Sequence, residues 1–162
     1  MNLEFLHALF PHEIIHDQDI YGGRVAYYKS KNMEGRTSIF QSGKMISAGT
    51  KSLEKATQEL KLVAKALNAS LKTEPRIQNI VATADLGFEV DIPKIVSSKK
   101  TKLIYEPDQF PGAIIRLPLS EKGVVATILL FASGKLVCVG LKDPKDIPHT
   151  IVQVLAEIEI HS

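Results

Sequence analysis

The sequence contains few of the residues that stabilise small secreted or metal-bound proteins. Its 162 residues include one cysteine, Cys138, which excludes an internal disulfide and any zinc site built from several cysteines. We expect none of its five histidines to be a metal ligand. We therefore expect no metal and no other cofactor, and we expect Cys138, which alternates with Val137 and Val139, to be a core residue.

Long apolar runs are also missing. No stretch approaches the roughly 20 apolar residues that are needed to cross a bilayer. The N-terminus carries the acidic Glu4 where a secretory signal peptide would be basic. We therefore expect an intracellular protein without a membrane partner, located in the cytoplasm if the cell is archaeal and in the nucleus if it is eukaryotic.

The chain has no large excess of charge of one sign. Its 20 Lys and Arg residues against 18 Asp and Glu give a net charge of +2, which excludes a tail that binds nucleic acid by bulk charge alone. Lysines gathered on one face could still contact it. The chain also lacks a phosphate-binding glycine loop, a Gly-x-Ser-x-Gly elbow and a nucleophile paired with a base, so we do not expect an enzyme.

What the sequence does contain is an internal repeat. Residues 39–51 (IFQSGKMISAGTK) match residues 130–142 (LFASGKLVCVGLK) at a constant offset of 91 residues. Upstream, HDQDIYGG at 16–23 matches YEPDQFPG at 105–112 at an offset of 89, and the difference of two residues falls in a loop. A repeat of this kind indicates two copies of one structural unit. We assign residues 1–68 to the first repeat, 69–75 to a linker and 76–162 to the second repeat.

Both halves have the same order of expected elements. In the first half, strands at 24–29, 36–40 and 44–48 form an antiparallel meander, and Ser52 can cap a helix that follows. In the second half, strands near 113–118, 124–131 and 135–139 precede a helix that begins behind Asp146. The second half also opens with an extended segment at 76–87 that has no counterpart in the first half. The sequence therefore predicts an α+β fold.

Several motifs resemble the TATA-binding protein family, most closely its archaeal members. IQNIVA at 77–82, YEPDQFPG at 105–112 and LFASGK at 130–135 occur in the order of the family, and the first half keeps SIFQSGK at 38–44. The resemblance covers nearly the whole chain and implies a TBP-like saddle of two repeats, each a curved antiparallel β-sheet backed by helices. It also implies a general transcription initiation factor that binds TATA-box promoter DNA in the minor groove and recruits transcription factor B.

The resemblance extends to individual residues. Phe110 and Phe131 match a pair of phenylalanines that insert between base steps, while Tyr21 replaces one member of the pair in the first half. Tyr27 stands where the second half has Arg116. The expected factor-B contacts are Glu106 and Asp108, with Gln109 beside them. The expected DNA-binding residues are Phe110, Phe131, Phe40, Tyr21, Asn79, Val81, Leu129, Val137, Val139, Ile46, Ala48, Arg116, Lys135, Lys142, Lys44 and Lys51.

The centre of the expected DNA site departs from the family. Where the family has a threonine in each half, this chain has Ala48 and Val139, which cannot donate to the acceptors of A·T pairs in the minor groove. The central asparagine and valine of the first half are missing together with their strand. We therefore expect a weaker sequence preference than in the family. The alternative is a divergent member with weak or no TATA binding that acts through protein contacts, with factor B or with a second copy.

The missing strand leaves two strand edges unpaired, one at 44–48 and one at 76–83. Exposed backbone donors and acceptors at such edges favour pairing with another strand. The two edges could pair with each other in a single nine-strand sheet, or two chains could pair through them as a homodimer. The sequence leaves both alternatives open.

Overall fold

The computed structural model describes residues 1–97, 103–119 and 125–159. The chain divides into two compact units, Met1–Arg76 and Ile77–Ser162. The first unit contains α1 (Leu3–Leu9), β1 (Ile14–His16), a 3-10 turn (Tyr21–Gly23), β2 (Val25–Tyr28), β3 (Arg36–Phe40), β4 (Met45–Ala48) and α2 (Leu53–Ala66). The second unit contains β5 (Ile80–Asp85), α3 (Ile92–Ser97), β6 (Leu103–Ile104), β7 (Gly112–Pro118), β8 (Val125–Phe131), β9 (Lys135–Leu141) and α4 (Asp146–Glu159).

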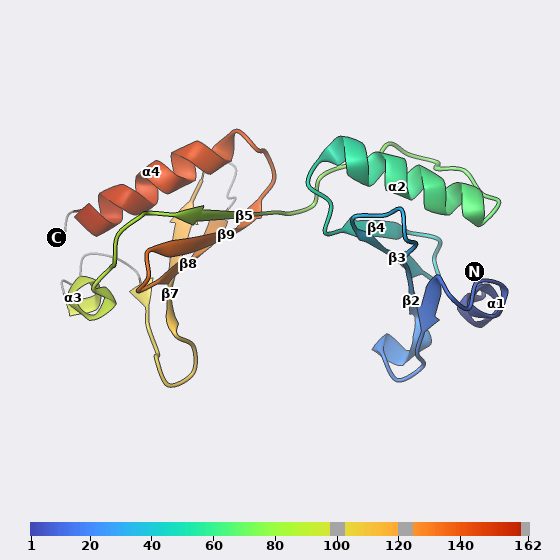
Figure 1. Ribbon diagram of the computed structural model, residues 1–162, viewed down its shortest axis with the longest axis horizontal. Helices are drawn as coiled ribbons and strands as arrows, with labels where there is room; N and C mark the ends of the chain where they lie inside the picture. Colours follow the sequence, from blue (N-terminus) through green and yellow to red (C-terminus); the bar gives the residue numbers. More distant parts are fainter. Residues whose placement is uncertain (98–102, 120–124, 160–162) are drawn as a thin grey trace. The chain divides into compact units, whose positions relative to one another are not determined.

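Each unit contains its own antiparallel sheet, and the two sheets share the same order of strands. The strand order is β1-β2-β3-β4 in the first unit and β5-β9-β8-β7-β6 in the second, so β2, β3 and β4 correspond to β7, β8 and β9 (Figure 1). The predicted meanders are confirmed, with strand ends within two residues of the expected ones. The strands β1 and β6 were missed because three and two residues carry too little periodicity to be recognised.

The strand β5 is the main difference between the units. It pairs with β9, and the first unit has no matching strand beside β4 within its described residues. The described strands form two sheets, one of four strands in the first unit and one of five strands in the second. β4 is hydrogen-bonded to β3 and β5 to β9, and in the described residues neither has a second partner strand.

The repeat also extends to the helix at the start of each unit. Leu3 and Leu6 of α1 are buried, as are Ile92 and Ile95 of α3 at the matching positions. The N-terminal ammonium of Met1 donates a hydrogen bond of 2.8 Å to the carbonyl of Gln41. The matching bond in the second unit joins the N–H of Val90 to the carbonyl of Ala132, also at 2.8 Å. The two units therefore share one architecture from α1 and α3 onward.

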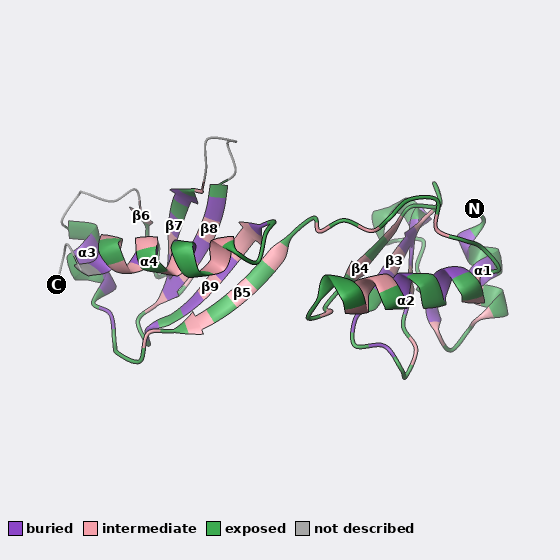
Figure 2. Cartoon of the chain, turned by 90° about the horizontal axis from the view of Figure 1, so that it is seen from above, coloured by how far each residue is buried: buried purple, intermediate pink, exposed green. Residues whose placement is uncertain are grey.

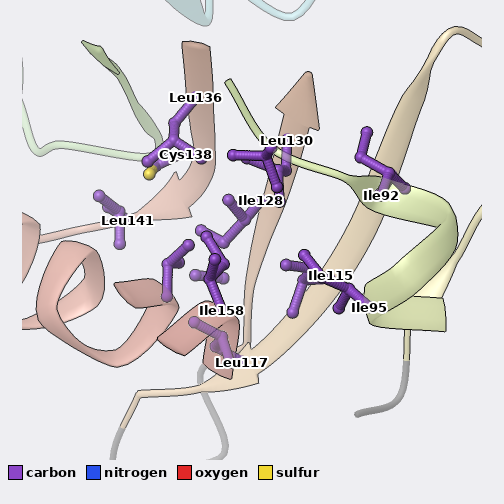
Figure 3. Packing of buried hydrophobic residues seen from close by; sticks show 14 residues of the cluster. Ile92, Ile95, Ile115, Leu117, Ile128, Leu130, Leu136, Cys138, Leu141 and Ile158 are labelled. Carbon is purple, nitrogen blue, oxygen red and sulfur yellow. The ribbon is translucent and has the colours of Figure 1, made fainter. Parts of the chain in front are cut away.

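Helices cover one face of each sheet. In the second unit, Val154 and Ile158 of α4 pack with strand residues such as Ile128 and Leu136 in one apolar cluster, to which α3 adds Ile92 and Ile95 (Figure 3). Cys138 is fully buried in the same cluster, as expected, and burial raises the pKa of its thiol. This helix-covered face is therefore the hydrophobic core of the unit.

The opposite face of the second sheet is open. Along β8, the buried Ala126, Ile128 and Leu130 alternate with residues that keep part of their surface exposed, and β9 alternates in the same way (Figure 2). Side chains of a strand point alternately to the two faces of its sheet, so the second set faces away from α3 and α4. Each strand thus presents a row of residues that the core does not use.

The loop between β2 and β3 in the first unit is fixed from two sides. The ammonium of Lys29 donates to the carbonyls of Met33, Glu34 and Gly35 at 2.7, 2.7 and 2.8 Å. The Glu59 carboxylate of α2, only 3% exposed, accepts the N–H of Glu34 at 2.7 Å and that of Gly35 at 3.2 Å. These bonds satisfy the polar groups of the loop and position the first residue of β3.

We expect Glu59→Ala to destabilise the first unit by about 2–3 kcal/mol, because two backbone N–H groups lose a charged acceptor in a buried place. Chemical denaturation followed by circular dichroism measures the change. The matched control is Glu54→Ala on the same helix, where the carboxylate is exposed and accepts a single side-chain bond from Gln58. A loss for Glu59→Ala no larger than for Glu54→Ala would show that the buried carboxylate does not hold the loop.

Candidate nucleic-acid interface

The open face of the second unit is organised in rows that run across the strands. Residues directly opposite one another in antiparallel strands share a face, so the pairing register identifies the members of each row. One row consists of Val81, Val139, Thr127 and Arg116, and the next consists of Thr83, Val137, Leu129 and Ile114. The expected groove contacts Val81, Leu129, Val137 and Val139 therefore lie side by side on one mostly apolar surface, with Val81 58% exposed.

A pair of aromatic rings lies at one end of this face. The centroids of Phe110 and Phe131 are 5.7 Å apart and their planes meet at 61°, an edge-to-face contact. Gly112 makes room for the rings, since a Cβ there would lie 2.8 Å from Cε1 of Phe110 and 3.1 Å from Cε1 of Phe131. The two phenylalanines that the sequence places 21 residues apart are thus brought together at the start of β7 and the end of β8.

Asn79 lies just before β5, and its side chain bonds to a bulge in the neighbouring strand β9. Its Oδ1 accepts the N–H of Gly140 at 2.8 Å, where the register between β5 and β9 shifts. Gly140 has a φ of +97°, which favours glycine. Because the amide oxygen is used in this bond, the Asn79 side chain presents its NH₂ group as a donor, and no acceptor for that group lies within the described residues.

The expected cations lie around the edges of the open faces. Arg116 is the last residue of the row that begins at Val81, and Lys135 lies opposite Asp85 at the start of β9. Both side chains are exposed, as are Lys142 after β9, Lys44 before β4 and Lys51 after it. These positions allow the cations to reach a charged backbone that lies along a sheet face.

The open face of the first unit is more polar. Its central row contains Ile15, Tyr27, Ser38 and Ile46, and the next row pairs Arg36 with Ala48. Phe40 lies opposite Val25 at the end of β3. Tyr21 is 74% exposed in the 3-10 turn and makes no ring contact with Phe40, although both residues are described. The structure therefore forms the aromatic pair in the second unit and not in the first.

The strand pairing also corrects the match between Tyr27 and Arg116. Tyr27 lies opposite Ser38 just as Ile114 lies opposite Leu129, and Ser38 and Leu129 occupy the same repeat position. Tyr27 therefore corresponds to Ile114, and the residue that corresponds to Arg116 is Lys29 in the loop between β2 and β3. The offset of 89 residues holds for the segment before β2, up to Gly23 and Gly112. It falls to 87 within β2, because the first unit has two additional residues after Gly23.

Several residues of the open faces were not among the DNA-binding residues expected from the sequence, namely Arg36, Thr83, Thr127, Ile114 and Ile104. Arg36 and Thr127 occupy the same repeat position, and each lies four residues before a recognised phenylalanine in the same strand. Because side chains of a strand alternate between its two faces, residues an even number of positions from Phe40 and Phe131 lie on the same, open face. This alternation was the signal that could have found them.

The acidic turn before β7 is fully exposed. The carbonyl of Glu106 accepts the N–H groups of Gln109 and Phe110, both at 2.9 Å, and closes a tight turn. The side chains of Glu106, Asp108 and Gln109 all lie at the surface. One turn therefore presents two carboxylates outward and directs Phe110 toward Phe131.

No helix in the described ranges is long and apolar enough to cross a membrane. In the same residues, no group of three or more His, Cys, Asp or Glu side chains could hold a metal ion.

Two compact units, each an antiparallel sheet backed by helices and built on the same repeat, define a two-repeat α+β protein. Residues 74–160 match the family described as "Transcription factor TFIID (or TATA-binding protein, TBP)". The chain belongs to the TATA-binding protein family, and the family resemblance and the α+β fold inferred from the sequence are confirmed.

Individual relatives are archaeal. The TATA-box-binding protein of Cenarchaeum symbiosum is 37% identical over 150 residues, which cover 89% of this chain and 79% of that protein. TATA-box-binding protein E of Halobacterium salinarum is 37% identical over 150 residues, covering 89% of this chain and 77% of that protein. The structure of Methanococcus jannaschii TBP matches with a TM-score of 0.79 and 30% identity over 98% of this chain and 89% of that one. These relatives are named for DNA binding and not for catalysis.

Proposed function

We propose that this protein is a transcription initiation factor that binds TATA-box promoter DNA in the minor groove through the open faces of its two sheets. The observation that carries this proposal is the Phe110–Phe131 pair at the end of an uncovered apolar face. An apolar sheet cannot read the donors and acceptors of the major groove, but it can press into a minor groove that widens. Aromatic wedges between base steps then kink the duplex, and the added contact offsets the cost of unstacking.

Polar groups on the same face support recognition of A·T pairs. The minor groove of these pairs presents only acceptors, N3 of adenine and O2 of thymine. The free NH₂ group of Asn79 and the hydroxyls of Thr83 and Thr127 are donors on or beside the open face of the second unit. Arg116, Lys135 and Lys142 would contact phosphates and fix the position of the protein without reading sequence.

The acidic turn supports a second contact, with transcription factor B. Glu106 and Asp108 are exposed, and the turn is closed by backbone bonds that leave both carboxylates free to pair with a basic partner. Charged groups at the rim of an interface mainly increase association rate and specificity. We therefore assign Glu106, Asp108 and Gln109 to the recruitment of factor B.

The second candidate function is that of a family member that binds TATA DNA weakly and acts through protein contacts. Three features of the first unit favour this second candidate. Tyr21 and Phe40 make no ring contact, and the Ala48 side chain has no hydrogen-bond donor. Among the described strands, β4 also has one edge unpaired. The free edges of β4 and β5 could pair two chains as a homodimer. Light scattering at micromolar concentration tests this directly, and a monomer would eliminate the homodimer.

A mobility-shift assay separates the two functions. A TATA-box duplex and a scrambled duplex are each titrated at one stated salt concentration, with and without factor B, because affinity depends steeply on salt. Preferential shift of the TATA duplex, with a larger complex when factor B is added, would support the initiation factor. Equal weak binding to both duplexes together with tight factor-B binding would support the second candidate, and no complex of any kind would contradict both.

A further inference from the structure

The two open faces carry different chemistry at one repeat position. Arg36 begins β3 opposite Ala48, and Thr127, at the matching position of β8, lies opposite Val139. A cation in the first unit thus occupies the place of a hydroxyl in the second. Nothing in the core requires this difference, because both residues lie on the face that the helices do not cover.

Arg36 is held in place by an aromatic ring. Its Cζ lies 4.3 Å from the centroid of the Tyr27 ring in the neighbouring strand β2. Tyr27 is half-buried and is flanked in its row by Ser38, so the ring forms a fixed support. A guanidinium that stacks on a ring keeps its five N–H donors at its edges, where they can bond to another molecule.

The guanidinium is also unpaired. Arg36 is exposed, and within the described residues no carboxylate or carbonyl accepts a bond from it. The neighbouring loop satisfies its carbonyls through Lys29 instead. The Tyr27 ring therefore covers one side of the Arg36 guanidinium, and the N–H donors of the guanidinium are free to bond to a ligand on the open face.

We propose that Arg36, stacked on Tyr27, inserts into the DNA minor groove and gives the first unit a preference for an A/T-rich half-site. This inference rests on the proposed DNA binding. The minor groove of A·T pairs presents only the acceptors N3 of adenine and O2 of thymine, which match the N–H donors of the guanidinium. The first unit, which lacks the aromatic pair, then binds by a stacked cation where the second binds by aromatic wedges.

A consequence is that the two half-sites are read unequally. Thr127 is short and uncharged, so a G·C pair below it meets a hydroxyl, whereas a G·C pair below Arg36 brings the guanine N2 amino group against a cation. The penalty for introducing G·C should be larger in the half-site bound by the first unit. Such a difference would also orient the protein on a nearly symmetric TATA sequence.

The test uses the full chain and fluorescence anisotropy with a TATA-box duplex and two further duplexes that carry G·C pairs in one half-site each. Arg36→Ala is expected to weaken binding of the TATA duplex by about tenfold. The slope of log K against log salt is negative, and its magnitude should decrease by about 0.9, the value for one neutralised phosphate. The G·C penalty should shrink in one half-site and stay unchanged in the other.

Two further variants complete the design. Lys61→Ala removes one exposed cation from α2, on the covered side of the sheet, and should change affinity less than about twofold at every salt concentration. Arg36→Lys keeps the charge without the planar group, and should keep the salt slope while reducing the difference between the half-sites. Circular dichroism confirms that each variant is folded before titration.

The outcomes are distinguishable. If the wild-type chain binds the TATA duplex and Arg36→Ala binds within twofold of it at every salt concentration, Arg36 only supports β2 and β3 and the inference is wrong. If the salt slope falls but both half-sites keep their G·C penalties, Arg36 contacts a phosphate outside the groove, which also overturns it. If the wild-type chain binds none of the duplexes, the proposed function fails and this inference fails with it.

Discussion

Replacing Gly134 by alanine should destabilise the second unit by more than about 3 kcal/mol, because the change combines a steric clash with a strained backbone. Gly134 has a φ of +81°, and a Cβ there would lie 2.1 Å from the carbonyl oxygen of Phe88 and 3.2 Å from its carbon. These neighbours are backbone atoms and cannot move aside like a flexible side chain. Chemical denaturation followed by circular dichroism measures the loss.

The internal repeat supplies the matched control. Gly43 occupies the same position in the first unit with a φ of +84°, but a Cβ there would meet no atom within 4 Å. Gly43→Ala therefore carries the backbone strain alone, about 1–2 kcal/mol. Equal losses for the two variants would show that the segment before α3 does not pack on the turn between β8 and β9 as described.

The double variant Phe110→Ala, Phe131→Ala should bind the TATA duplex about 100-fold more weakly than the wild-type chain. Each ring is expected to stack on a base, a contact whose removal costs about 1–3 kcal/mol. Anisotropy titration at fixed salt measures the change. The slope of log K against log salt should stay the same, because no charge is removed.

Phe5→Ala is the control for this experiment, since Phe5 is 59% exposed on α1, a helix whose Leu3 and Leu6 pack in the same apolar cluster as Val63 of α2. It should bind DNA like the wild-type chain. Unchanged affinity in the double variant, with normal folding, would contradict the assignment of the Phe110–Phe131 pair as wedges and would favour the candidate function that depends on protein contacts.

Much of the fold follows from the sequence because the repeat tests each prediction twice. Ser52 caps α2 by accepting the N–H of Lys55 at 3.1 Å, as its place before an amphipathic run predicts. The strand β3 and its repeat β8 keep the phenylalanine, serine and glycine that end a strand and form the next turn. Similar patterns at a constant offset make the assignment stronger than one pattern alone.

The sequence could not show contacts that depend on long-range geometry. Glu59 lies 24 residues from Gly35, and nothing in the pattern of α2 indicates that its carboxylate holds a loop of the sheet. The bond from Gly140 to Asn79 joins residues 61 positions apart. The contact between Arg36 and Tyr27 depends on the register of β2 against β3, whereas the offset of 89 residues matched Tyr27 with Arg116 instead of Ile114.

Reading of the minor groove by the open sheet faces is tested most directly by changing the base pairs. Replacing A·T by inosine·cytosine alters the major groove and leaves the minor groove without an amino group, whereas G·C adds the N2 amino group of guanine. We expect the wild-type chain to bind the inosine-substituted TATA duplex within about twofold of the natural one, and the G·C-substituted duplex about tenfold or more weakly. Equal loss of affinity for both substituted duplexes would show that the protein reads the major groove, and would contradict the proposed interface.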